Sequence, residues 1–286
     1  MIFNKLHQLT TLGFDDFPLF FEVCLLSATF RLFVSYFLIS KISKLIKFKT
    51  DYIRFKFTHR GYDLVHYSIS ALIGSVAIQQ RPYRHCFYFS FDCGDEFMQQ
   101  TEPRDRCIMS NIEKIYYMFF TAYYIIDLFF IWTNKSDKKL LTLHHFTTIS
   151  LILISIYIRT HVIGVNVMLL HDVVDVPLYF GKIFTYLGLK NAQDFSLLLF
   201  GLLCTWFRMI CFPGVIYNGI KNGLKQIPEH LTFYCIEGGI LFILMFCHIM
   251  WFIRIVEGVI NIFTKGKDAI CDNRSEDATN YIKKPI

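Results

Sequence analysis

The chain has 286 residues, of which 54% are hydrophobic and 17% aromatic, and its formal net charge is +6 at pH 7. A soluble domain carries about 25% charged residues, whereas this chain has 18% and a mean hydropathy of +0.41. These values exclude an ordinary soluble domain and indicate a single-domain membrane protein with several spans. The basic residues lie in short loops beside apolar segments, so the positive charge indicates topology and not nucleic-acid binding.

Seven apolar segments follow one another along the chain, and each is long enough to cross a bilayer as a helix. They cover residues 17–42, 62–78, 112–132, 140–158, 162–187, 195–217 and 231–256. We therefore predict an all-α fold, a polytopic membrane helical bundle of about seven transmembrane helices. The first segment is too long for a signal-peptide core and is followed by Lys, so we expect it to remain as a span. Pro213 is expected to kink or end the sixth helix.

Six basic residues follow the first segment: Lys41, Lys44, Lys47, Lys49, Arg54 and Lys56. The positive-inside rule places this loop in the cytoplasm, the N-terminus in the lumen and, after seven spans, the C-terminus in the cytosol. Two interpretations of the cluster stay open. It is either a topology signal alone, or also a site for anionic lipid head groups or for the phosphates of a soluble donor.

The connecting segments add three expectations. The loop 81–111 is expected to be lumenal and oxidising, with one disulfide among Cys86, Cys93 and Cys107 in a pairing that stays open. The loop 218–230 is expected on the same side. The tail is expected to be disordered and cytosolic, and it ends Lys283-Lys284-Pro285-Ile286, similar to a dilysine retrieval signal of the endoplasmic reticulum.

The stretch 144–186 concentrates the polar chemistry in two apolar segments. His171, Asp175, Lys182 and Tyr186 share one helical stripe, with Asp172 at its edge. The preceding segment carries the polar set His144, His145 and Thr148. An ionisable group inside a span costs roughly 2.5–3.5 kcal/mol on insertion scales, so these residues are functional candidates. Asp127, within the third segment, is expected to face the bundle.

This pattern resembles the signature of the ceramide synthases, the longevity-assurance family of TLC-domain membrane proteins. The matching positions are His144-His145, Thr148, Ser155, Gly164, His171-Asp172-x-x-Asp175, Lys182 and Tyr186, all in register. The pair Arg208 and Pro213, the last span with His248 and Trp251, and the acidic run 272–277 are also similar to the family. Three positions depart from it: Arg159 and Val162 replace an Asn and an Arg, and Tyr179 replaces a Glu.

The resemblance implies an N-terminal segment with the first span (1–49), a six-helix TLC domain (50–262) and the tail (263–286). It also implies that a fatty acyl group passes from acyl-CoA, the co-substrate, to the amine of a sphingoid base. No other cofactor and no metal are expected. The expected partners are acyl-CoA, the sphingoid base and membrane lipids, with a homo- or heterodimer as an open possibility and no nucleic acid. The expected location is the endoplasmic reticulum membrane.

Roles for the residues follow from the needs of amide formation. We expect the catalytic set to be His144, His145, His171, Asp172 and Asp175. Within it, His145 is the favoured base or acyl carrier because it shares a helix face with Thr148, and the aspartates orient histidines or bind the ammonium. The expected substrate-binding set is Thr148, Ser155, Lys182, Tyr186 and Arg208. We expect His248 to pack or to line a tunnel.

Two alternatives stay open. His and Asp are ligand types for zinc or iron, although the ten histidines form none of the H-x-x-H-H or H-x-x-x-H boxes of membrane di-iron enzymes. The second alternative is a non-catalytic TLC protein that senses lipid or assists translocation. Such relatives commonly lack the full histidine and aspartate set that is present here.

Overall fold

The computed structural model describes residues 16–79, 81–88, 109–134, 138–158, 160–226 and 231–265. Within these ranges the regular structure is helical, as predicted. The α-helices are α2 (Phe17–Leu32), α3 (Ser40–Leu45), α4 (Asp51–Gln79), α6 (Asn111–Asn134), α7 (Lys138–Tyr157), α8 (His161–Leu187), α9 (Lys190–Leu203), α10 (Phe212–Gln226) and α11 (Leu231–Lys265). Two π-helices, η2 (Phe33–Ile39) and η6 (Cys204–Cys211), continue α2 and α9, and a 3₁₀-helix η3 spans Pro82–Phe87.

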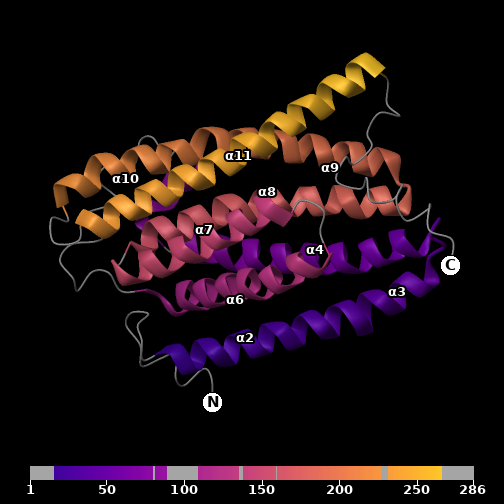
Figure 1. The fold of residues 1–286 in the computed structure, drawn as a ribbon, viewed down its shortest axis with the longest axis horizontal. Helices are drawn as coiled ribbons and strands as arrows, with labels where there is room; N and C mark the ends of the chain where they lie inside the picture. Colours follow the sequence, from indigo (N-terminus) through magenta and orange to yellow (C-terminus); the bar gives the residue numbers. More distant parts are fainter. Residues whose placement is uncertain are drawn as a thin grey trace.

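The helices form an elongated bundle in which α8 is central (Figure 1). Helix α8 packs most extensively on α4 and α9, while α2 packs on α6 and α11 packs on α7 and α10. Helix α8 ends at Gly188, whose φ of 71° is the left-handed conformation that glycine adopts without strain. This turn lets α9 run back along α8, and it places the polar stripe of α8 inside the bundle.

Six helical segments of the described residues are long and apolar enough to cross a membrane: Phe17–Leu45, Asn111–Ile131, Lys139–Tyr157, His161–Leu187, Lys190–Lys221 and Leu231–Glu257. The seventh predicted span, 62–78, lies within α4, whose 29 residues are long enough. Polar side chains lower its hydropathy, and Asp63, His66 and Ser70 are at most 1% exposed within the bundle. Helix α4 is therefore long enough to be a span but less apolar than the other six.

Several helices extend beyond the predicted spans: α4 begins at Asp51 and α11 runs to Lys265. Of the two expectations at Pro213, that it kinks or ends the sixth helix, the second is wrong, because η6 leads directly into α10 and the N–H of Phe212 bonds the carbonyl of Phe207. Pro213 lies in the first turn of α10, where its missing N–H is tolerated. The segment 218–230, expected to be a loop, is helical as far as Gln226. The helical backbone thus continues past Pro213, with the π-helix η6 directly before it.

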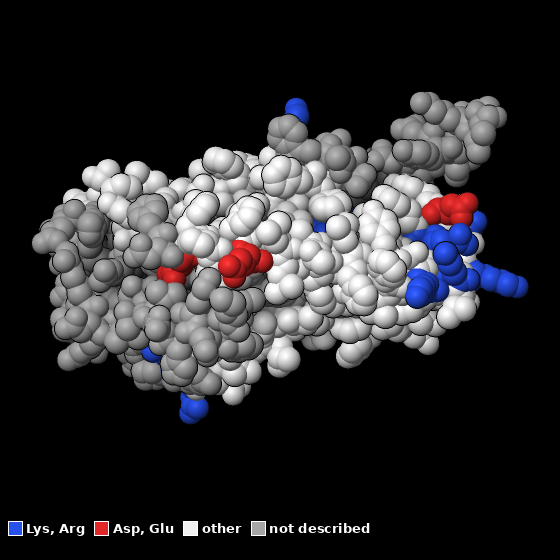
Figure 2. All heavy atoms as spheres, turned by 90° about the horizontal axis from the view of Figure 1, so that it is seen from below, with Lys and Arg blue, Asp and Glu red and all other residues white. Residues whose placement is uncertain are grey.

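Basic side chains gather at one end of the bundle. Figure 2 shows Lys and Arg gathered at one end, where the exposed Lys41, Lys44, Lys47, Lys49 and Arg54 surround the junction of α3 and α4. We call this the basic end. At the far end of α4, Cys86 is disulfide-bonded, and the predicted alternatives Cys93 and Cys107 lie outside the described residues. A disulfide at the end opposite the basic residues is consistent with the predicted orientation, which stays a prediction.

Candidate active site

Four buried histidines meet in the middle of the bundle, and we call them the histidine cluster. Helix α7 supplies His144 and His145, α8 supplies His171 and α11 supplies His248, each at most 6% exposed. The ring centroid of His144 lies 5.7 Å from that of His145, 6.1 Å from that of His171 and 6.2 Å from that of His248. The histidines predicted from two separate spans are therefore brought together. His248, expected to pack or line a tunnel, joins them.

Hydrogen bonds define the proton positions in half of the cluster. The Nδ1 of His171 lies 2.6 Å from the carbonyl of Val167, so this nitrogen donates. Its Nε2 then accepts from the Nε2 of His248 at 2.9 Å. This leaves a lone pair on the Nδ1 of His248. Within the described residues, neither this nitrogen nor the Nδ1 of His144 has a hydrogen-bond partner. The lone pair on His248 can accept a proton, whereas no contact among these residues fixes the tautomer of His144.

His145 is held on both sides of its ring. Its Nδ1 lies 3.0 Å from the carbonyl of Leu141, and its Nε2 lies 3.1 Å from Oδ2 of Asp127. Asp127 faces the bundle as predicted, and its Oδ1 lies 3.0 Å from Nη2 of Arg31. A carbonyl and a carboxylate both accept, so His145 makes both hydrogen bonds only as an imidazolium, which has no lone pair. The role of base or acyl carrier therefore suits His144 better than His145.

The two aspartates of the α8 stripe have different partners. Asp172 accepts hydrogen bonds from Ser70 at 2.6 Å and from Tyr116 at 2.7 Å. These contacts point toward α4 and α6, whereas the sequence led us to expect contact with a histidine. Asp175 pairs with Arg208 at 2.7 Å, and the same guanidinium donates to the backbone carbonyl of His171 at 3.1 Å. Arg208, on η6, thus fixes the backbone of α8 beside the histidine cluster.

The other predicted substrate-binding residues form local contacts. Thr148 donates to the carbonyl of His144 at 2.7 Å, and Ser155 donates to that of Ile152 at 2.9 Å. The ammonium of Lys182 lies 4.8 Å from the ring centroid of Tyr179. Tyr186 is half-buried in the aromatic core between α4, α6 and α8. Lys182 is therefore close to the cluster, whereas Tyr186 belongs to the packing around it.

Two cavities border the histidine cluster. The first, of about 90 Å³, we call the polar cavity, and the histidines on its wall are His144, His145 and His248. Its charged lining residues are Arg60, Asp127, Asp175, Lys182 and Arg208. Because Arg60 lies near the start of α4 and Lys182 near the end of α8, this cavity faces the basic end.

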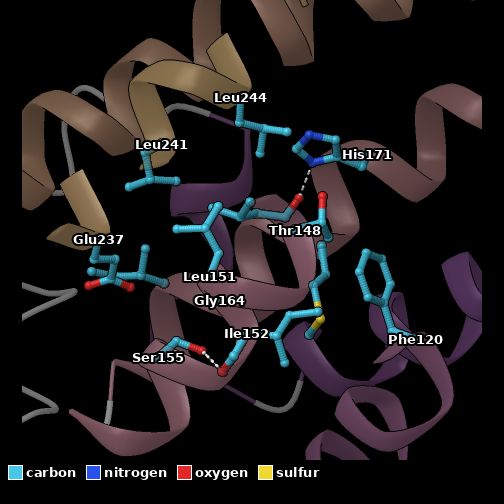
Figure 3. A pocket seen from close by; sticks show the side chains of 13 residues that line it. Phe120, Thr148, Leu151, Ile152, Ser155, Gly164, His171, Glu237, Leu241 and Leu244 are labelled. Carbon is cyan, nitrogen blue, oxygen red and sulfur yellow. Dashed lines mark hydrogen bonds between the residues drawn. The ribbon is translucent and has the colours of Figure 1, made fainter. Parts of the chain in front are cut away.

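The second cavity, of about 30 Å³, we call the apolar cavity. Leu151, Ile152, Leu241 and Leu244 form much of its wall. Figure 3 shows His171 and Glu237 on opposite sides of it. The histidine cluster therefore separates a charged cavity from a hydrocarbon-lined one. A charged head group and an apolar chain of one substrate could contact the same histidines.

Sequence reasoning missed several polar residues of this region. Arg31 lies in the first apolar segment, Ser70 in the second and Glu237 in the last, and each is at most 6% exposed. Arg31 and Glu237 carried the same signal as the identified residues, an ionisable group inside a predicted span. Ser70 carried no such signal, because serine is common in membrane helices. Arg159, one of the noted departures, lies outside the described residues.

In the part of the chain that the structure describes, no group of three or more His, Cys, Asp or Glu side chains is arranged to hold a metal ion. The donors of the histidine cluster instead point at one another, at backbone carbonyls and at Asp127.

Comparison with known proteins identifies the family. Residues 56–257 match the TLC domain. Human ceramide synthase 1 is 31% identical over 155 residues, which cover 51% of this chain and 44% of that protein. The ceramide synthase LOH1 of Arabidopsis thaliana is 27% identical over 236 residues, 78% of this chain and 74% of that protein. Alternaria stem canker resistance protein 1 of Solanum lycopersicum is 31% identical over 235 residues, with the same coverage. The chain therefore belongs to the TLC-domain family, among the ceramide synthases.

Proposed function

We propose that this protein transfers a fatty acyl group from acyl-CoA to the amine of a sphingoid base, and so forms a ceramide and free CoA. The observation that carries the proposal is the buried histidine cluster between a polar and an apolar cavity. The names of the similar proteins support the same reaction.

The chemistry needs one proton acceptor near the reacting carbonyl. A sphingoid amine is an ammonium ion at neutral pH, so it must lose a proton before it attacks the thioester. The C–N bond then forms and the attacking nitrogen gives up its second proton. The tetrahedral intermediate collapses as the C–S bond breaks, the thiolate takes up one of the two protons, and the other passes to solvent. We assign the base to His144, because its ring lies at the centre of the cluster and on the wall of the polar cavity. Protonated His144 then returns one proton to the thiolate, because the N–H groups of His171 and His248 are already donated to Val167 and to His171.

The two cavities suit the two parts of an acyl-CoA. The CoA portion carries anionic phosphates, and the polar cavity faces the basic end with Arg60 and Lys182 on its wall. The fatty acyl chain requires an apolar enclosure, and Leu151, Leu241 and Leu244 line a cavity of about 30 Å³ on the other side of His171, which must widen to admit a full chain. In this arrangement the thioester carbonyl lies at the histidine cluster.

We further propose that the protein resides in the endoplasmic reticulum membrane with the basic end in the cytosol. The N-terminus is then lumenal and the C-terminus cytosolic, so that CoA enters the polar cavity from the cytosol. The dilysine sequence at Lys283 and Lys284 supports this location, and it lies outside the described residues.

The test is an acyl-transfer assay in microsomes from cells without ceramide synthase activity of their own. A sphingoid base and a panel of acyl-CoA donors are supplied, and ceramides are measured by mass spectrometry. We expect product with the unmodified chain and with His85→Ala, an exposed histidine at the opposite end. The His144→Ala variant, expressed at the same level, should give none. Absence of product from the unmodified chain with every donor would contradict the proposal and favour a non-catalytic lipid sensor.

A further inference from the structure

We propose that Arg31, in the N-terminal helix, is a positioning residue of the active site. It holds Asp127, which in turn holds His145. Arg31 lies outside the region 56–257 that matches the TLC domain, so the inference extends the active site to a helix beyond that domain. It rests on the proposed function, because His145 lines the cavity assigned to the substrate.

The contacts of Arg31 are those of an enclosed, fixed side chain. The residue is 4% exposed, and its Nη2 lies 3.0 Å from Oδ1 of Asp127, which is 1% exposed. The guanidinium carbon lies 3.9 Å from the ring centroid of Phe130 and 4.9 Å from that of Tyr62. Two aromatic rings, one from α6 and one from α4, therefore confine the guanidinium beside the carboxylate.

The charge on Arg31 determines what Asp127 can do. A guanidinium stays protonated in proteins, and a buried carboxylate remains ionised only when it is paired. An ionised Asp127 can only accept hydrogen bonds. The Nε2 of His145, 3.1 Å from Oδ2, must therefore carry a proton and donate it. Arg31 thus fixes both the protonation of this nitrogen and the orientation of the ring.

The orientation of His145 affects its neighbour. Its ring centroid lies 5.7 Å from that of His144, and both residues line the polar cavity. Nε2 donates to Asp127 and Nδ1 donates to the carbonyl of Leu141, and these two bonds hold the ring of His145 in place beside His144. We infer that the chain from Arg31 through Asp127 to His145 keeps the wall of the cavity fixed around the base.

A purely structural role for Arg31 is the competing explanation. The buried residues of α2 are Leu19, Ser27 and Arg31, and all three could simply anchor this helix to the bundle. Only a role at the site makes the effect of Arg31 depend on His145. Arg31 does not line the polar cavity and reaches it only through Asp127 and His145. A substitution of Arg31 should therefore slow the chemical step and leave substrate binding largely unchanged.

The experiment compares Arg31→Met, Arg31→Lys and Asp127→Asn in the purified full-length protein, with Leu32→Ala as the matched control. Leu32 is the next residue on the same helix and is 50% exposed. The kcat and the KM for both substrates are measured per folded molecule. We expect Arg31→Met and Asp127→Asn to lower kcat about 10- to 100-fold. For Arg31→Met, which lies outside the cavity wall, KM should change less than about twofold. Arg31→Lys should restore most of kcat, because it returns the charge.

A double-mutant cycle with His145→Ala gives the decisive readout. We expect Arg31→Met to cause no further loss of kcat in the His145→Ala background, because the ring that Arg31 holds through Asp127 is already absent. Additive losses, or an unchanged kcat with only a lower melting temperature, would show that Arg31 merely anchors α2 and would overturn the inference. If the unmodified protein makes no ceramide, that result contradicts the proposed function and does not by itself decide the role of Arg31. The same cycle is then measured by thermal unfolding, where coupling between Arg31 and His145 supports the inference and additivity overturns it.

Discussion

The Nε2 atoms of His171 and His248 lie 2.9 Å apart, although 77 residues separate them in the chain. The contact joins α8 to α11 across the centre of the bundle. Because the carbonyl of Val167 fixes the tautomer of His171, His248 must be the donor, and its buried Nδ1 then carries a lone pair. His248 is therefore a polar member of the site and not a packing residue in an apolar helix.

Replacement of His248 tests this relationship. We expect His248→Ala to lower the rate of ceramide formation about 100-fold, because His171 loses its proton donor. His248→Asn, whose amide can still donate, should lose less. The control is Ile249→Ala, a neighbour that is 41% exposed on the outside of the helix. Rates are compared at equal amounts of folded protein, and full activity of His248→Ala would exclude His248 from the mechanism.

The two adjacent histidines of α7 should respond differently to substitution. His144→Ala removes the proposed base, so kcat should fall by about 10²- to 10⁴-fold. His145→Ala removes a ring whose nitrogens are both engaged, and its kcat should fall less. Initial rates with a saturating acyl-CoA measure the difference. A larger loss for His145→Ala would return the role of base to His145, as its shared helix face with Thr148 suggested.

The fold was largely predictable because hydrophobic length and charge placement are properties of the chain itself. Each predicted span lies within a helix of the structure, including 62–78 in the more polar α4. The continuation past Pro213 was not predictable, because a π-helix responds to tertiary packing. The extension of α10 to Gln226 was missed for a related reason, since its polar residues resemble a loop.

The residues of the site were predictable, but their partners were not. Ionisable side chains in apolar segments identified His144, His171 and Asp175 without a structure. The spacing of residues along one helix cannot show which residue of another helix a given side chain contacts. Asp172 therefore bonds Ser70 and Tyr116, which sequence reasoning did not connect with it.

Gly164, a position of the family signature, leaves room for a tyrosine. A Cβ at this residue would collide with the hydroxyl of Tyr117 and would lie 2.9 Å from its Cζ. That hydroxyl donates to the carbonyl of His161 at 3.0 Å and lies 3.3 Å from Oγ of Ser155. We expect Gly164→Ala to lower the free energy of unfolding by about 1–3 kcal/mol through overpacking. Tyr117→Phe should restore part of it in the double variant, as measured by denaturation in micelles; equal stability of Gly164→Ala and the unmodified chain would contradict this account.

Glu237 separates two apolar spaces and is the residue that we expect to limit the acyl chain. It borders the apolar cavity and a second cavity of about 20 Å³, whose wall includes Val215 and Ile216. Thr160 donates to its Oε1 at 2.9 Å. Glu237 lies eleven residues before His248 on α11, roughly 16 Å along the helix, which is about half of the ~30 Å hydrocarbon core of a bilayer. A chain that starts at the histidine cluster therefore ends against this carboxyl group, and burying its methyl end there is unfavourable.

Removing that barrier should lengthen the preferred chain. We expect Glu237→Ala to join the two cavities and to raise the ratio of long-chain to shorter-chain ceramides about tenfold. Glu237→Gln keeps the volume and can still accept from Thr160, so its product distribution should stay close to that of the unmodified protein. Both variants are assayed with an equimolar mixture of acyl-CoA donors, and the ceramides are separated by mass. An unchanged distribution in Glu237→Ala, at normal total activity, would show that the chain does not reach Glu237. A shift of equal size in Glu237→Gln would instead assign the effect to the charge of the carboxylate and not to the space it fills.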